Sequence, residues 1–194
     1  MKKSVVRAVI LCAALAGVIL CVGFISIQTN YTVQPDNSNL AEQTARFLQH
    51  KTASPTAEEI RIYDSVSLGK ERYVLMELLQ AGEPSLGMIF LEQGPNERYK
   101  IDHVGWGDGN FRDTVVSSDQ QDYFVIGGRN TYFGISSLKV EVGGQEYTLA
   151  VPEGDHFLVY TELTSLGENT YIDWETFTLF NRSGADITDQ ISWN

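Results

Sequence analysis

The stretch LKVEVGGQEYTLAVP, from Leu138 to Pro152, decides the fold class of this chain. In its first half, apolar residues alternate with Lys139 and Glu141, so an extended segment would bury one face and expose the other. The glycine pair Gly143-Gly144 follows, and both central residues of a type I′ turn need the positive φ that glycine adopts freely. The stretch therefore predicts an antiparallel β-hairpin.

The same period of two residues runs outward from this hairpin, beginning at Glu59. Between turn signals it predicts about ten strands, at residues 60–63, 73–79, 88–91, 98–104, 114–116, 123–126, 138–142, 145–151, 157–163 and 171–180. The segments 73–79 and 88–91 are apolar on both faces and need cover on each side. We expect a mainly β (α+β) fold, with a first antiparallel sheet followed by a β-sandwich-like C-terminal half.

One amphipathic helix is predicted ahead of the strands, over residues 39–51. Asn39 is placed to cap its first turn, and Glu42 is placed to reach back and complete a capping box. The helix should end before Pro55, because the residue that precedes a proline disfavours helical geometry. Its apolar face is expected to cover one side of the first sheet, while residues 31–38 are expected to be a spacer.

The N-terminal segment, residues 1–30, has a short basic head and a long apolar body. No charged residue occurs from Ala8 to Ile27, a length of roughly 30 Å as a helix, which matches the hydrocarbon core of a bilayer. Lys2, Lys3 and Arg7 place this end in the cytoplasm by the positive-inside rule. The pattern predicts a single-pass, uncleaved transmembrane anchor followed by an extracytoplasmic domain; a cleaved signal peptide is the alternative.

Cysteine content and charge restrict the chemistry of the remaining chain. Both cysteines, Cys12 and Cys21, lie in the apolar segment, so residues 31–194 can form no disulfide, thiolate metal site or cysteine nucleophile. Those residues hold 11 of the 14 basic residues and all 25 acidic ones, a net charge of −14. Such a surface repels phosphate groups, which argues against a nucleic-acid partner.

The stretch YKIDHVGWGDGNFRD, Tyr99–Asp113, gathers the polar groups most suggestive of a site. We interpret it as a strand followed by a glycine-rich turn. Alternation along the strand predicts that Asp102 and His103 point to opposite faces and form no dyad. His103 would then be a buried or edge histidine bonded to a backbone carbonyl. The turn, near residues 105–112, is a candidate boundary inside the domain of residues 39–194, which we expect to be one compact unit.

The candidate binding residues are Trp106, Asp108, Asn110 and Asp113. Trp106 is expected to be exposed, because glycines flank it on a predicted loop. The other three offer oxygen ligands for a nonstandard calcium site, but the EF-hand pattern fails because its fifth position is the cation Arg112. We therefore predict no metal and no cofactor.

Catalytic motifs are weak throughout the chain. The segments 67–70 and 136–139 satisfy S-x-x-K, but S-D-N and K-T-G do not occur, and G-x-S-x-G and H-E-x-x-H are also missing from the sequence. The chain is therefore predicted not to be an enzyme. Its aromatic residues either fill the core or form a sugar-stacking platform; the candidates for the second role are Trp106, Trp174, Trp193, Tyr132 and Phe133.

The order of features resembles small uncharacterised membrane-anchored extracytoplasmic proteins of Gram-positive bacteria. The phrases that carry the resemblance are RYKIDHVGWG, YFVIGGRN, LKVEVGGQEYTLAVP and FLVYTEL. The resemblance implies a location in the cell envelope and assigns no functional residue. We predict a binding or sensing module in the cell membrane, with a protein or cell-wall component as its partner. The alternatives are a cell-envelope hydrolase with a site near residues 105–113, and a structural subunit of a membrane complex.

Overall fold

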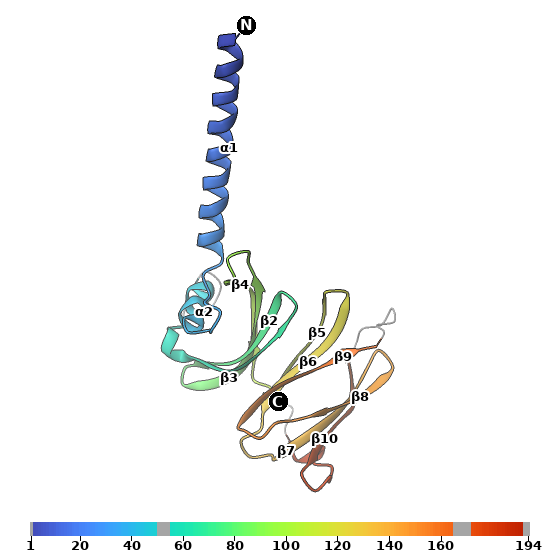
Figure 1. The fold of residues 1–194 in the computed structure, drawn as a ribbon. Coiled ribbons are helices and arrows are strands. Elements are labelled where there is room, and N and C mark those ends of the chain that lie inside the picture. Colours follow the sequence, from blue (N-terminus) through green and yellow to red (C-terminus); the bar gives the residue numbers. More distant parts are fainter. Residues whose placement is uncertain (1, 50–54, 165–171, 192–194) are drawn as a thin grey trace.

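The computed structural model describes residues 2–49, 55–164 and 172–191, with the side chains of residues 2–11 and 13 excepted. Figure 1 shows a long N-terminal helix that leads into stacked β-sheets. The helices are α1 (Lys2–Asn30), α2 (Leu40–Leu48) and the short 3-10 helices η1 (Ala57–Glu59) and η2 (Thr188–Gln190). The strands are β1 (Ile60–Leu68), β2 (Glu71–Gln80), β3 (Glu83–Gln93), β4 (Tyr99–Gly107), β5 (Phe111–Ser118), β6 (Gln121–Arg129), β7 (Ile135–Val142), β8 (Gln145–Ala150), β9 (His156–Leu163) and β10 (Ile172–Asn181).

The strands form three antiparallel sheets, which confirms the prediction of a mainly β, α+β fold. The first sheet has the order β1-β2-β3-β4, the middle sheet β5-β6-β9 and the outer sheet β10-β7-β8. The hairpin of β7 and β8 turns at Gly143 and Gly144, whose φ angles are +60° and +82°, as the glycine pair predicted. Among the described side chains, no helix is both long and apolar enough to cross a membrane.

Helix α2 covers one face of the first sheet, as its amphipathic pattern predicted. Leu40 and Leu48 are buried against Val74, Met76 and Ile89 in one apolar cluster. Between α1 and α2, the segment predicted to be a spacer is also packed. Its Val33 is 1% exposed and exchanges two backbone hydrogen bonds with Tyr99 of β4, at 2.9 and 3.0 Å.

The predicted capping role of Asn39 is wrong. Its side chain accepts a hydrogen bond from the Gln34 backbone N–H (2.8 Å) and donates one to the Thr32 carbonyl (3.0 Å), so it ties the helix start to the preceding segment. Glu42 pairs with Arg46, one helical turn further on, at 2.6 Å. These two backbone groups replace the N–H groups of the helix as partners of the Asn39 side chain, and only folding of residues 31–38 brings them near it.

Apolar side chains pack against both faces of the middle sheet. On one face, Phe124 and Ile126 of β6 join the outer sheet around a sandwich core. On the other face, Val125 of β6 and Leu158 of β9 pack against Leu75 and other residues of the first sheet. This second cluster contains residues from both halves of the chain, so the two runs of strands share a core.

Candidate functional site

A β-bulge in β4 places two polar side chains on the same side of the strand. His103 pairs with Phe90 of β3, but the next residue of β3, Leu91, pairs with Ile101, so Asp102 is an extra residue in the ladder. Alternation of side chains restarts at such a bulge. The His103 Nδ1 atom lies 2.9 Å from Oδ2 of Asp102. The prediction that these residues point apart is therefore wrong, because it assumed an uninterrupted strand.

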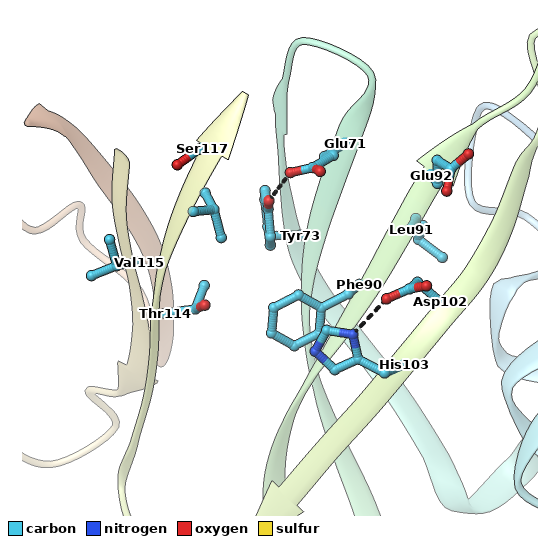
Figure 2. A pocket seen from close by; sticks show the side chains of 11 residues that line it. Glu71, Tyr73, Phe90, Leu91, Glu92, Asp102, His103, Thr114, Val115 and Ser117 are labelled. Atoms are coloured by element: carbon cyan, nitrogen blue, oxygen red, sulfur yellow. Dashed lines mark hydrogen bonds and ion pairs between the residues drawn. The ribbon is translucent and has the colours of Figure 1, made fainter. Parts of the chain in front are cut away.

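This pair lines a cavity of about 450 Å³ between the first sheet and β5, here named the β4–β5 cleft. Figure 2 shows β5 on one side and the Phe90 and His103 rings on the other. The first-sheet residues that line it are Glu71, Tyr73, Phe90, Leu91, Glu92, Asp102 and His103, and the β5 residues are Thr114, Val115, Val116 and Ser117. The volume of the cleft is within the usual range for ligand pockets.

The imidazole of His103 is held in place yet accessible. Its ring stacks on Phe90 with centroids 3.6 Å apart and planes 18° from parallel, and the side chain is 52% exposed. The Asp102 carboxylate contacts one ring nitrogen, and the other lies on the side of the ring that faces β5 (Figure 2). His103 lies on β4, the end strand of the first sheet as the structure describes it, so the edge placement is confirmed. The predicted backbone-carbonyl partner is wrong, because the ring contacts the Asp102 carboxylate. The histidine presents a hydrogen-bonding atom to the cleft.

The remaining charges make the cleft acidic. The Tyr73 hydroxyl donates a hydrogen bond to the Glu71 carboxylate, and burial together with that carboxylate raises the pKa of Tyr73, so the phenol stays neutral. Lys100 offsets one acid, since its Nζ atom lies 2.8 Å from Oε2 of Glu92. Glu71 and Asp102 contribute two further carboxylates at the lining of the cleft.

The β5 side of the cleft is the edge of a sheet. Within the described residues, β5 pairs with β6 and lies at the end of its three-stranded sheet. Residues Thr114–Ser117 therefore present a row of backbone N–H and C=O groups beside the cleft, with which an added strand can pair. The cleft thus combines a peptide-like hydrogen-bonding edge with an acidic, aromatic wall.

The four candidate residues from the sequence do not line this cleft. Trp106 is partly buried and packs against the cluster beneath α2, so the prediction that it is exposed on a loop is wrong. The reason is that β4 continues through Gly107. Asp108 is the acceptor of a 3.4 Å hydrogen bond from Ser85, and the Asn110 carbonyl accepts one from the Arg129 backbone N–H at 3.0 Å.

The fourth candidate, Asp113, lies in β5 next to Arg112, whose guanidinium donates to the carbonyls of Leu86 (2.9 Å) and Phe111 (2.6 Å). Burial lowers the pKa of Arg112, while the charges of Asp113 and Asp108 act to raise it, so a cation already lies near both acids. In the described part of the chain, no group of three or more His, Cys, Asp or Glu side chains is arranged to hold a metal ion.

A second polar cluster, here named the Glu77 cluster, joins the first sheet to the middle sheet. The Glu77 side chain is 7% exposed, and its Oε1 atom lies 2.8 Å from Arg129 Nε and 3.4 Å from His156 Nε2. The Tyr63 hydroxyl donates to Oε2 at 2.5 Å, and the Tyr63 ring stacks on His156 with centroids 3.6 Å apart. In the sequence, the feature that could have indicated this cluster is Glu77 itself, the single acidic residue in the otherwise apolar run of residues 73–79.

The Glu77 cluster keeps its carboxylate ionised. Burial raises the pKa of Glu77, but hydrogen bonds from Tyr63 and Arg129, the charge of Arg129 and the contact with His156 lower it by more. The net result is a pKa below the ordinary value of 4.5. Burial, followed by the neighbouring Glu77 carboxylate, raises the pKa of Tyr63 to about 12, so this hydroxyl remains a donor.

This lowered pKa predicts acid-sensitive stability. The unfolded chain protonates Glu77 near pH 4.5, whereas the folded chain does so only at lower pH. The stabilisation is therefore complete above pH 4.5 and is lost as the pH falls through the folded pKa. Urea unfolding at several pH values should give the native chain a larger free energy of unfolding than Glu77→Gln. This difference should be constant above about pH 5 and should decrease below it. A difference that increases on acidification would contradict this assignment.

No protein-family model matches this chain, and neither the curated proteins nor the solved structures contain a match.

Proposed function

We propose that this chain is a membrane-anchored, extracytoplasmic binding module whose β4–β5 cleft receives an extended peptide segment rich in lysine or arginine. The observation that carries the proposal is the position of the β5 edge beside the acidic wall of Glu71 and Asp102. A peptide that adds a strand to β5 gains backbone hydrogen bonds, and its alternate side chains reach the wall.

The location rests on the N-terminal segment. Its uncharged run from Ala8 to Ile27 has the length of a bilayer core, and its basic residues favour a cytoplasmic N-terminus. The acidic character of residues 31–194, together with the placement of both cysteines in the apolar segment, is compatible with an extracytoplasmic domain.

The lining of the cleft suits a cationic strand. A lysine or arginine that points at the first sheet would meet the carboxylates of Glu71 and Asp102, and its aliphatic stem would contact the Phe90 ring. The next side chain would point away from this wall because strand side chains alternate. We therefore expect peptides with alternating basic residues to bind better than peptides in which basic residues are adjacent.

A hydrolase is the second candidate function, because Asp102 and His103 have the orienter-and-base arrangement that activates a nucleophile. The hydroxyl groups near them on β5 belong to Thr114 and Ser117. Ser117 donates its hydroxyl hydrogen to the Asp122 carboxylate, which is a different partner from His103. This favours a role for His103 in binding over a role as a catalytic base.

The test uses protoplasts of cells that produce the full chain and a fluorescent octapeptide of alternating lysine and valine. Saturable binding to intact protoplasts is expected, with little binding of the glutamate–valine counterpart. Asp102→Asn and Glu71→Gln should each weaken binding by up to about fivefold, the usual range for an exposed charge pair. Added salt should weaken binding further, because it screens the charges.

The matched control is Glu162→Gln, which neutralises an exposed acid on β9 outside the cleft and should leave binding unchanged. Binding that appears only after permeabilisation would contradict the proposed location but retain the proposed ligand. Equal binding of the two octapeptides, or equal losses in the control and cleft variants, would contradict the proposed ligand.

A further inference from the structure

A second cavity, of about 460 Å³, lies at the other end of β5 from the β4–β5 cleft. It is lined by Gly109, Phe111, Arg112, Asp113 and Trp174. It therefore brings the start of β5, in the middle sheet, together with β10 of the outer sheet. Its volume is within the range of small-molecule sites, and its lining mixes aromatic surface with two opposite charges.

An irregularity in β10 presents Trp174 at this cavity. Asp173 pairs with Glu141 of β7, but Thr178 pairs with Lys139, so β10 contains three residues more than its partner over this interval. The irregularity is held by hydrogen bonds: the Thr176 hydroxyl donates to the Asp173 carbonyl at 2.8 Å and accepts from the Glu141 N–H at 3.2 Å. Bulges of this kind commonly redirect a side chain next to a functional site.

The indole of Trp174 is anchored on the core and exposed at the surface. Its ring centroid lies 5.2 Å from that of Phe177, which is 3% exposed, and Phe177 in turn lies 5.8 Å from Phe111. Trp174 itself is 41% exposed. A large aromatic surface is thus held in a defined orientation beside the cavity, although a tryptophan of a β-rich domain would ordinarily be covered.

The polar groups of the cavity favour an uncharged ligand. The Arg112 guanidinium is fixed by two backbone carbonyls, and the absence of a side chain at Gly107 gives it room, since a Cβ atom there would lie 2.7 Å from Nη2. Arg129, Asp113 and Asp108 all lie near enough to act on the pKa of Arg112, so two acids and two guanidinium groups are close to one another here. These acids disfavour an anionic ligand, while the guanidinium disfavours a cationic one.

We propose that this cavity is a carbohydrate-binding site that stacks a neutral sugar ring on Trp174 and hydrogen-bonds ring hydroxyls to Arg112 and Asp113. A sugar offers an apolar C–H face for the indole and a rim of hydroxyls that both donate to a carboxylate and accept from a guanidinium. The site shares no lining residue with the β4–β5 cleft, so this proposal does not rest on the proposed peptide ligand.

The test uses the full chain in a zwitterionic detergent, because maltoside head groups are themselves sugars. Chitotetraose, cellotetraose and maltotetraose are titrated separately, and binding is followed by calorimetry and by tryptophan fluorescence. Saturable binding of at least one of the three is expected. Trp174→Ala should weaken that binding at least about tenfold, and Trp174→Phe should retain part of it because a smaller aromatic face remains.

The structure separates the predicted stacking candidates, since Tyr132 is 92% exposed and lines a different cavity from Trp174. Tyr132→Ala is therefore the matched control. Tyr132→Ala should bind the sugar with the same affinity as the native chain. Circular dichroism of each variant shows whether it is folded, and the partial binding of Trp174→Phe separates loss of stacking from loss of structure. The proposal is overturned if none of the three sugars binds, if Trp174→Ala binds as well as the native chain, or if Tyr132→Ala loses binding to the same extent.

Discussion

Replacing Glu77 with leucine should lower the free energy of unfolding by about 3–5 kcal/mol, the usual cost of removing one partner from a buried ion pair. The Arg129 side chain is only 19% exposed and would lose its carboxylate 2.8 Å away. The Tyr63 hydroxyl and the His156 ring would lose the same partner. Urea unfolding at pH 7 measures this loss, which we expect to be among the largest of any single substitution in the first sheet.

The double variant Glu77→Leu/Arg129→Met should recover most of that stability. Removing both charges leaves no buried ion without a partner, and apolar replacements of buried pairs are often nearly neutral. The control pair is Lys139–Glu146, whose side chains are 37% and 60% exposed, and Glu146→Leu should change stability by about 1 kcal/mol or less. If Glu77→Leu costs no more than Glu146→Leu, the Glu77 cluster does not stabilise the junction between the sheets.

Replacing Leu75 with alanine should cost about 2–5 kcal/mol and should destabilise both halves of the chain together. Leu75 is fully buried between the first and middle sheets, in the cluster that also contains Val125 and Leu158. The sheets approach closely there, since a Cβ atom on Gly127 would lie 2.6 Å from a Leu75 methyl group. A cavity at this point therefore removes contacts from both sheets.

Two tryptophans allow the halves to be followed separately. Variants that retain only Trp106 report on the first sheet, and variants that retain only Trp174 report on the outer sheet. In Leu75→Ala, the Trp106 and Trp174 signals should both change at one lower urea midpoint. The comparison variant Leu138→Ala, in the sandwich core, should likewise show one lowered midpoint for both signals. A shift of the Trp106 transition without a shift of the Trp174 transition would show that the halves unfold independently.

Much of the architecture was predictable because it depends on local chemistry. The Gly143-Gly144 pair specifies its hairpin through the positive φ that the turn needs. The apolar run of residues 73–79 required cover on both faces, and α2 provides it on one of them. Each of these inferences needs only neighbouring residues and the geometry of a strand or helix.

The candidate sites depended on details that a periodic pattern does not contain. The alternation of side chains along a strand predicted that Asp102 and His103 point apart. One extra residue in the β3–β4 ladder instead brings their side chains into contact. In the same way, β4 continues through Gly107, so Trp106 packs against the core beneath α2. Bulges and strand ends are set by pairing between strands, and a single strand does not reveal them.

The sequence by itself determined the β-rich class, the amphipathic helix, the central hairpin and the acidic charge of residues 31–194. Only the tertiary structure decided which polar groups meet. Glu77 finds Arg129 and His156, which are 52 and 79 residues away in the chain. Contacts at such separations follow from how the sheets stack on one another. Burying a charge is unfavourable unless it has ionic or hydrogen-bonding partners, and here the stacking of the sheets provides those partners.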